Sequence, residues 1–237
     1  MIADEFFENT DFVGAFGATD WSAGWTVSGS VSNTTQPDFG CPDGTTSTVE
    51  TIDDKRVCQL SGAVTADLLL TSNNLYQLVG KVVIGGDNAD SAVLTLQAGT
   101  TVYGASPESF LVISRGSQIV ANGTRTAPII FTAEDDLQGL ADIDVDRGLW
   151  GGLVINGNAP INDCPEGATG GTQACVKEGE ANSGTFGGAI SDDSSGRLNY
   201  VVVKFAGSNV DPENQLNGIA FQAVGSGTDV NYVQVHN

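Results

Sequence analysis

The chain has 237 residues, 40% of them hydrophobic, which is enough to bury a sizeable core and excludes a disordered protein. Its 29 acidic and 9 basic residues give a formal net charge of −20, so nucleic acid and anionic membranes are excluded as partners. The 31 glycines follow no three-residue period, and Val, Ile, Leu and Thr dominate between them, which indicates an all-β fold.

Residues 1–27 differ from the rest of the chain in their aromatic content. Gly14, Gly17 and Gly24 argue against a long helix there. We predict residues 1–27 as an aromatic capping or assembly segment and residues 28–237 as the main domain, with a sugar-binding platform as the alternative role for the segment. The rings concerned are those of Phe6, Phe7, Phe12, Phe16, Trp21 and Trp25.

The four cysteines form two local pairs in loop-like surroundings, Cys41 with Cys58 and Cys164 with Cys175. Neither spacing is that of a zinc motif, and the chain has one His. Short loops close at a low cost in entropy, so we predict two local disulfides and an oxidising compartment. Four reduced thiols are the alternative.

The stretch 92–132 repeats one short pattern. Leu94 and Leu96 return seventeen positions later as Leu111 and Ile113, and Phe131 belongs to a third copy. Apolar residues alternate with others in each copy, and a Gly then turns the chain, which is typical of a strand with one buried face. Such units cannot bury an apolar face alone, so we expect them to stack as the parallel strands of a solenoid.

Two segments interrupt the strand pattern, an acidic one at 133–146 and a Gly/Ser/Asp-rich one at 162–197. In the first, Asp142, Asp144 and Asp146 alternate, and an extended strand would place their carboxylates on one face, as a Ca²⁺ site requires. The helix-loop-helix calcium pattern is absent. The alternative is a solvated acidic loop.

Catalytic motifs are weak. A lyase would combine calcium-binding Asp residues with a basic residue, such as Arg147, Arg115 or Lys204, but a chain of this charge suits an anionic polymer poorly. Paired carboxylates for glycoside hydrolysis are uninformative among 29 acidic residues. We interpret His236 as a surface or interface residue and Trp150 as a core or cap residue, with stacking of Trp150 on sugar rings as the alternative.

Three glycine-anchored segments, 147–161, 198–207 and 217–237, resemble a widespread family of secreted bacterial surface proteins and lipoproteins. The resemblance covers roughly residues 65–237. It implies a right-handed parallel β-helix and export, and it assigns no reaction to any residue of this chain. In such proteins the helix continues past the equivalent of 233–237, and the aromatic segment follows the helix instead of preceding it.

These patterns predict an all-β, right-handed parallel β-helix with long loops and an aromatic N-terminal segment. The first functional hypothesis is a non-enzymatic protein, extracellular or at the bacterial cell surface, that assembles head to tail. Residues 1–27 of one copy would then cover the terminal strands of the next, around Val233 and Val235. An excerpt of a longer helix and a self-capped monomer are the alternatives. The second hypothesis is a polysaccharide lyase or glycan-binding module, with surface polysaccharide as partner. No cofactor is expected besides Ca²⁺, and no apolar run approaches the roughly 18 residues of a membrane span.

Overall fold

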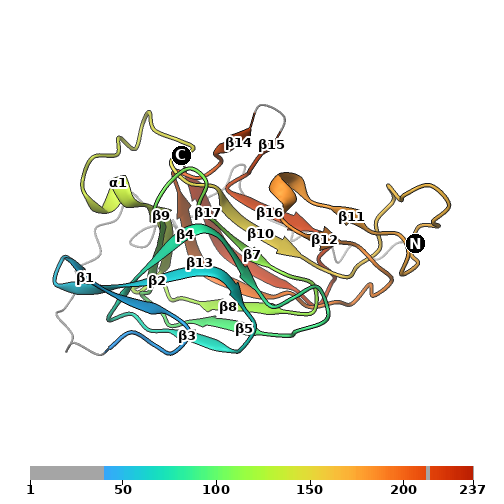
Figure 1. Cartoon of the computed structure of the whole chain (residues 1–237), viewed down its shortest axis with the longest axis horizontal. Helices are drawn as coiled ribbons and strands as arrows, with labels where there is room; N and C mark the ends of the chain where they lie inside the picture. Colours follow the sequence, from blue (N-terminus) through green and yellow to red (C-terminus); the bar gives the residue numbers. More distant parts are fainter. Residues whose placement is uncertain (1–39, 212–213, 237) are drawn as a thin grey trace, which may run out of the picture.

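The computed structural model describes residues 40–211 and 214–236, and their backbone is mainly strands and turns (Figure 1). Thirteen strands join in one sheet, whose neighbouring strands are parallel except for β1 and β2. The helical pieces of the described chain are α1 (Glu134–Leu137) and the 3-10 turn η1 (Glu180–Asn182). Consecutive strands lie on three faces that enclose one core, so the parallel β-helix predicted from the sequence is confirmed.

Face A is the longest of the three stacks. Its interior column runs through residues paired in register, and five of the six side chains are buried. The column consists of Cys58, Tyr76, Val102, Phe131, Val203 and Val235. The strands of face A are β2 (Lys55–Val64), β4 (Leu75–Ile84), β6 (Thr101–Gly104), β9 (Ile129–Ala133), β13 (Gly196–Lys204) and β17 (Asp229–His236).

Face B begins where β2 and β4 bend, and it continues through three further strands. Its strands beyond β4 are β7 (Phe110–Ile113), β10 (Gly152–Asn156) and β16 (Ile219–Gln222). One interior column on this face contains Val64, Ile84, Ile113, Ile155 and Phe221. Full burial of one such aliphatic side chain contributes about 1.5–3 kcal/mol, so the stacked columns are the main source of stability.

Face C consists of β3 (Leu68–Leu70), β5 (Val93–Leu96), β8 (Gln118–Asn122) and the first halves of β13 and β17. Its pairing shows that the seventeen-residue unit inferred from the sequence is not one turn of the helix. Leu94 pairs with Ile119, whereas Leu111 pairs with Val82 on face B. The alternation of apolar residues is the same on every face, so the pattern does not reveal which copies are stacked.

The corners between faces explain where the loops leave. Gly62 and Gly80 turn the chain from face A to face B with φ of 64°, a left-handed conformation that favours glycine. Tyr200 and Tyr232 turn it from face C to face A as single residues, and their rings stack with centroids 4.5 Å apart. In the later turns the long excursions leave from the corner between faces A and B and from the corner between faces B and C, and not from the corner between faces C and A.

The two excursions predicted from the sequence are confirmed. The acidic one, containing α1, joins faces A and B between β9 and β10, and the second joins β10 to β13. Figure 1 shows them at opposite sides of the helix, with α1 at the left and the hairpin of β11 (Lys177–Glu178) and β12 (Thr185–Phe186) at the right. A third excursion carries the hairpin of β14 (Asn209–Asp211) and β15 (Asn214–Gln215).

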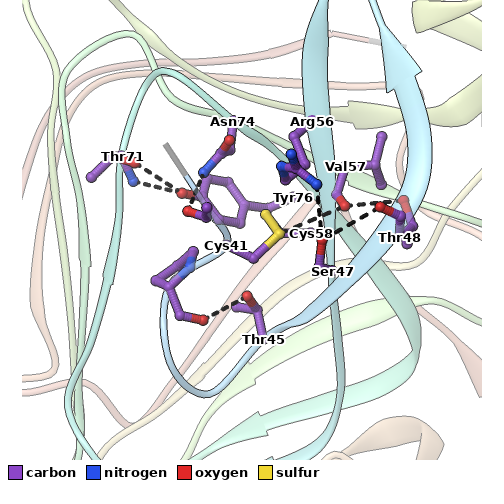
Figure 2. The surroundings of a disulfide bond; sticks show 12 residues. Cys41, Thr45, Ser47, Thr48, Arg56, Val57, Cys58, Thr71, Asn74 and Tyr76 are labelled. Atoms are coloured by element: carbon purple, nitrogen blue, oxygen red, sulfur yellow. Dashed lines mark hydrogen bonds between the residues drawn. A yellow bond between two sulfur atoms is a disulfide. The ribbon is translucent and has the colours of Figure 1, made fainter. Parts of the chain in front are cut away.

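Both predicted disulfides are present. Cys41 bonds Cys58 of β2, and Figure 2 shows this bond beside the ring of Tyr76, whose hydroxyl accepts a hydrogen bond from the Thr71 amide at 2.8 Å. The bond holds the chain that leads into β1 (Thr46–Ile52), which pairs antiparallel with β2 and covers the first strand of face A. Cys164 bonds Cys175 within the second excursion.

No helix in the described ranges is long and apolar enough to cross a membrane.

Candidate functional site

A groove of about 540 Å³ lies between the last described turn of face B and the 157–195 loop. Polar, acidic and aromatic side chains line it together. The lining consists of Ile161, Asn162, Asp163, Lys177, Glu178, Gly179, Glu180, Phe186, Asn217, Ala220, Phe221 and Gln222.

The β11–β12 hairpin forms the outer wall of the groove. Lys177 pairs in register with Phe186, which places an ammonium and a ring side by side on adjacent strands. The Lys177 ammonium forms an ion pair with the Asp163 carboxylate, and Glu178 Oε1 accepts a hydrogen bond from the Gly184 amide at 2.8 Å. The Cys164–Cys175 bond closes the loop between Asp163 and Lys177, so this wall carries a covalent cross-link beside the ion pair.

Contacts to the underlying turns hold the loop over face B. Asn88 and Asn158 exchange two amide hydrogen bonds, of 2.9 and 3.1 Å. The Arg115 guanidinium donates to Gly187 O at 2.8 Å while it pairs with Asp87, and Lys81 Nζ donates to Asn182 O at 3.0 Å. These contacts reach turns that precede β10, so the wall is anchored to more than one turn of the helix.

Polar atoms that lack partners lie beneath the groove. Asn156 and Gln222 pair in register on the outer surface of face B, and Asn156 Nδ2 donates to Ser183 O at 2.9 Å. The Asn156 and Gln222 amide oxygens and the Ser183 hydroxyl are buried, and none has a hydrogen-bond partner. A Cβ at Gly179 would lie 2.3 Å from Ser183 Oγ and 2.5 Å from Gln222 Oε1, so only glycine fits above them.

The groove is acidic and offers two rings. Asp163, Glu178 and Glu180 provide three carboxylates against the one ammonium of Lys177. Phe186 is half-buried, and Phe221 is 41% exposed although Ile155, its neighbour in the same column, is 1% exposed. An open groove that combines rings with acidic and amide groups is suited to binding a polar chain with apolar faces.

The acidic excursion does not form the strand face expected for calcium. Residues 143–145 form a turn, in which the amides of Val145 and Asp146 donate to Asp142 O. The Asp142 and Asp146 carboxylates accept the backbone amides of Asp144 and Asp142, at 3.0 and 2.8 Å. Short-range bonds of this kind favour a turn over a strand. The expectation that the three carboxylates lie on one strand face is therefore wrong, whereas Ca²⁺ binding itself stays a prediction.

The basic residues considered for lyase chemistry lie apart from one another. Arg115 belongs to the loop anchor described above, and Lys204 forms an ion pair with Asp136 beside α1. Arg147 is exposed on the acidic excursion, and the His236 Nδ1 atom is buried and without a hydrogen-bond partner on the last strand. None of the four lines the groove.

The Lys204–Asp136 pair belongs to a covered polar region outside face A. Asp136 also accepts the Thr132 hydroxyl at 2.7 Å, and Gln77 Nε2 donates to Glu134 at 3.3 Å. The Tyr103 hydroxyl is buried nearby without a partner. Burial, and then the negative charges of Glu50 and Glu134, raise the pKa of the Tyr103 phenol well above its ordinary value.

The residues predicted for assembly divide into two groups. Val235 is 49% exposed and Val233 is half-buried, both on the last described strand. Phe6, Phe7, Phe12, Phe16, Trp21 and Trp25, with the whole 1–27 segment, lie outside the described residues. Trp150 is fully buried in the core, where its indole Nε1 donates to Lys204 O at 2.7 Å, so its interpretation as a core residue is confirmed.

Sequence reasoning missed the groove because its two walls lie far apart in the sequence. From the sequence alone, the 162–197 segment is predicted as a loop and no more. The available signal was Phe186 and the Lys177–Glu178 pair within a glycine-rich segment.

Comparisons with known proteins support the fold by an independent route. A search of curated proteins and a search of solved structures each found no match. The model of one family, described as "Pectate-lyase like beta helix domain", matches residues 62–237. This range includes nearly all of the three stacked faces and both walls of the groove. The chain therefore belongs to the family of pectate-lyase-like β-helix domains.

Proposed function

We propose that this chain is a non-enzymatic glycan-binding protein of the cell surface, and that the groove beside β16 holds the glycan. The observation that carries the proposal is the lining itself, in which the Phe186 and Phe221 rings stand among amide and carboxylate groups. Rings of this kind pack against the apolar face of a sugar while polar side chains bond its hydroxyls. Membership of a pectate-lyase-like family favours a carbohydrate as the ligand.

Binding without cleavage is favoured by where the basic residues lie. A lyase needs a base beside the substrate, and the basic residue in the groove, Lys177, is held by Asp163. Two disulfides are typical of a secreted or extracellular protein, where a glycan ligand is available.

The test combines a glycan array with titration calorimetry and a reducing-end assay on each hit. We expect at least one oligosaccharide to bind and to remain uncleaved. Phe186→Ala should weaken that binding about tenfold, or about 1.4 kcal/mol, through loss of ring stacking. Tyr232→Ala removes an exposed ring at another corner and should leave the affinity unchanged. Release of new reducing ends would contradict the non-enzymatic assignment, and equal loss in both variants would contradict the site.

One observation favours a second function, head-to-tail assembly. Interior side chains that are buried in the other turns are exposed at the last described turn. Val203 is 0% exposed, whereas its register partner Val235 is 49% exposed. We propose that residues 1–27 of one copy cover this turn in the next, because they are rich in rings that need an apolar partner. The two surfaces in such a contact differ from each other, so repeating the contact adds copies in an open chain and does not form a closed dimer.

Deletion of residues 2–27 tests assembly, with sedimentation velocity and electron microscopy as readouts. The full chain should form elongated particles, and the deletion variant and Val235→Asp should remain folded monomers by circular dichroism. A full chain that stays monomeric at high concentration would contradict the proposal. Phe221 lies on both surfaces, so assembly and glycan binding should influence each other.

A further inference from the structure

The charge of the groove bears on which glycan it selects. Lys177 is held by Asp163, which leaves Glu178 and Glu180 without a cation in the lining. Glu178 accepts one amide hydrogen bond, and the Glu180 carboxylate has no hydrogen bond or ion pair within the described ranges. Both residues line the groove, and both side chains are exposed.

A second, independent observation concerns hydrogen bonding. Gln222 lines the groove, and its amide oxygen is buried and lacks a donor. Together with the carboxylates, the groove offers more acceptors than donors. A sugar hydroxyl brings donors and acceptors alike, whereas an ammonium group brings three donors and no acceptor.

We infer that the groove selects a cationic aminoglycan, a chain of sugars that carry free amino groups, over neutral chains and over uronates. This inference rests on the proposed glycan-binding function. A uronate would add acceptors and negative charge to a site that has both in excess, on a chain of net charge −20.

The experiment compares glucosamine, N-acetylglucosamine and galacturonate oligomers of equal length by titration calorimetry. Mildly acidic buffer keeps the amines protonated and the carboxylates ionised. We expect the glucosamine oligomer to bind about tenfold more tightly than its acetylated form, the galacturonate oligomer to bind weakest, and the preference to fall as salt is added.

The double variant Glu178→Gln with Glu180→Gln should abolish the preference for the free amine. Glu166→Gln with Asp144→Asn removes the same charge from exposed positions outside the lining and should retain it. If both double variants lose the preference equally, the overall charge of the chain is responsible and the inference is overturned. Equal affinity for the glucosamine and acetylated oligomers, or tighter uronate binding, overturns the inference and leaves the proposed function standing. Binding of no oligosaccharide overturns both.

Discussion

Tyr103 lies on the outer surface of face A but is buried there, because other elements cover it. Its ring packs with Val57 and Leu75 under β1 and α1, and the side chain is 0% exposed. The hydroxyl has no partner there, so it lost its water on folding and gained nothing in exchange.

Replacement of Tyr103 by Phe should therefore stabilise the protein, by about 1 kcal/mol in urea unfolding, because it removes an unsatisfied buried hydroxyl. The pH dependence has a definite sign. The pKa of the folded Tyr103 phenol is raised above its ordinary value of 10.0, so above that pH the unfolded chain releases a proton that the folded chain retains, and stability falls. Tyr103→Phe should weaken this alkaline loss. Unchanged or lower stability of the variant near neutral pH would contradict the account.

Residue-scale prediction from the sequence succeeded where the signal was local. The cysteine pairs and the alternation of Leu94 and Leu96 needed only neighbouring residues, and both are confirmed. It failed for Asp142, Asp144 and Asp146, because alternation also fits a turn whose carboxylates bond the adjacent amides. The groove could not be predicted at this scale, since Phe186 and Phe221 meet only once the fold is known.

At the scale of elements, the segment between β9 and β10 inserts the side chain of Trp150 into the core of the helix. Leu78, Gly104 and Ala133 follow one another in register on face A. The column narrows from Leu to Gly and Ala where the indole of Trp150 enters the core. A Cβ at Gly104 would lie 2.5 Å from the Cβ of Trp150, so Trp150 fits against β6 only because residue 104 has no side chain.

Gly104→Ala should destabilise the protein by about 1–3 kcal/mol, because the core there has no room for another methyl group. Gly40→Ala is the matched control: nothing lies within 4 Å of its added Cβ, and its stability should change little. Thermal and urea unfolding of both variants measure the difference. A neutral Gly104→Ala variant would show that Trp150 moves aside at low cost.

The order of elements could be predicted and their stacking could not. Strands, glycine turns and both excursions follow from periodicity, but the spacing of seventeen residues links face C to face B instead of one turn to the next. Only backbone pairing distinguishes the faces, since each is built from the same apolar alternation.

At the scale of the whole molecule, the two disulfides lie in parts that contribute differently. Cys58 belongs to the interior column of face A, whereas the Cys164–Cys175 bond lies in the groove wall, outside the stacked faces. Each turn contacts mainly its neighbours, so a disturbance in the wall need not spread along the helix.

Cys41→Ala with Cys58→Ala should lower the free energy of unfolding by roughly 2–4 kcal/mol and leave glycan affinity little changed. Cys164→Ala with Cys175→Ala should do the reverse, weakening binding while the main thermal transition stays near that of the parent. Calorimetric unfolding and oligosaccharide titration of the two double variants measure both effects. If the second pair lowers the main transition as much as the first, the wall and the helix are one cooperative unit.

The stacking of turns also determines how the molecule responds to force. Hydrogen bonds between parallel strands run along the helix axis, so a pull on its two ends loads each layer of bonds one after another. Both disulfides are local, spanning 17 and 11 positions, and neither joins distant turns, so neither disulfide shares that load. Under axial tension the β-helix should unwind turn by turn at low, repeated force, whereas a pull along the strands of a single turn would shear many bonds together and meet far greater resistance.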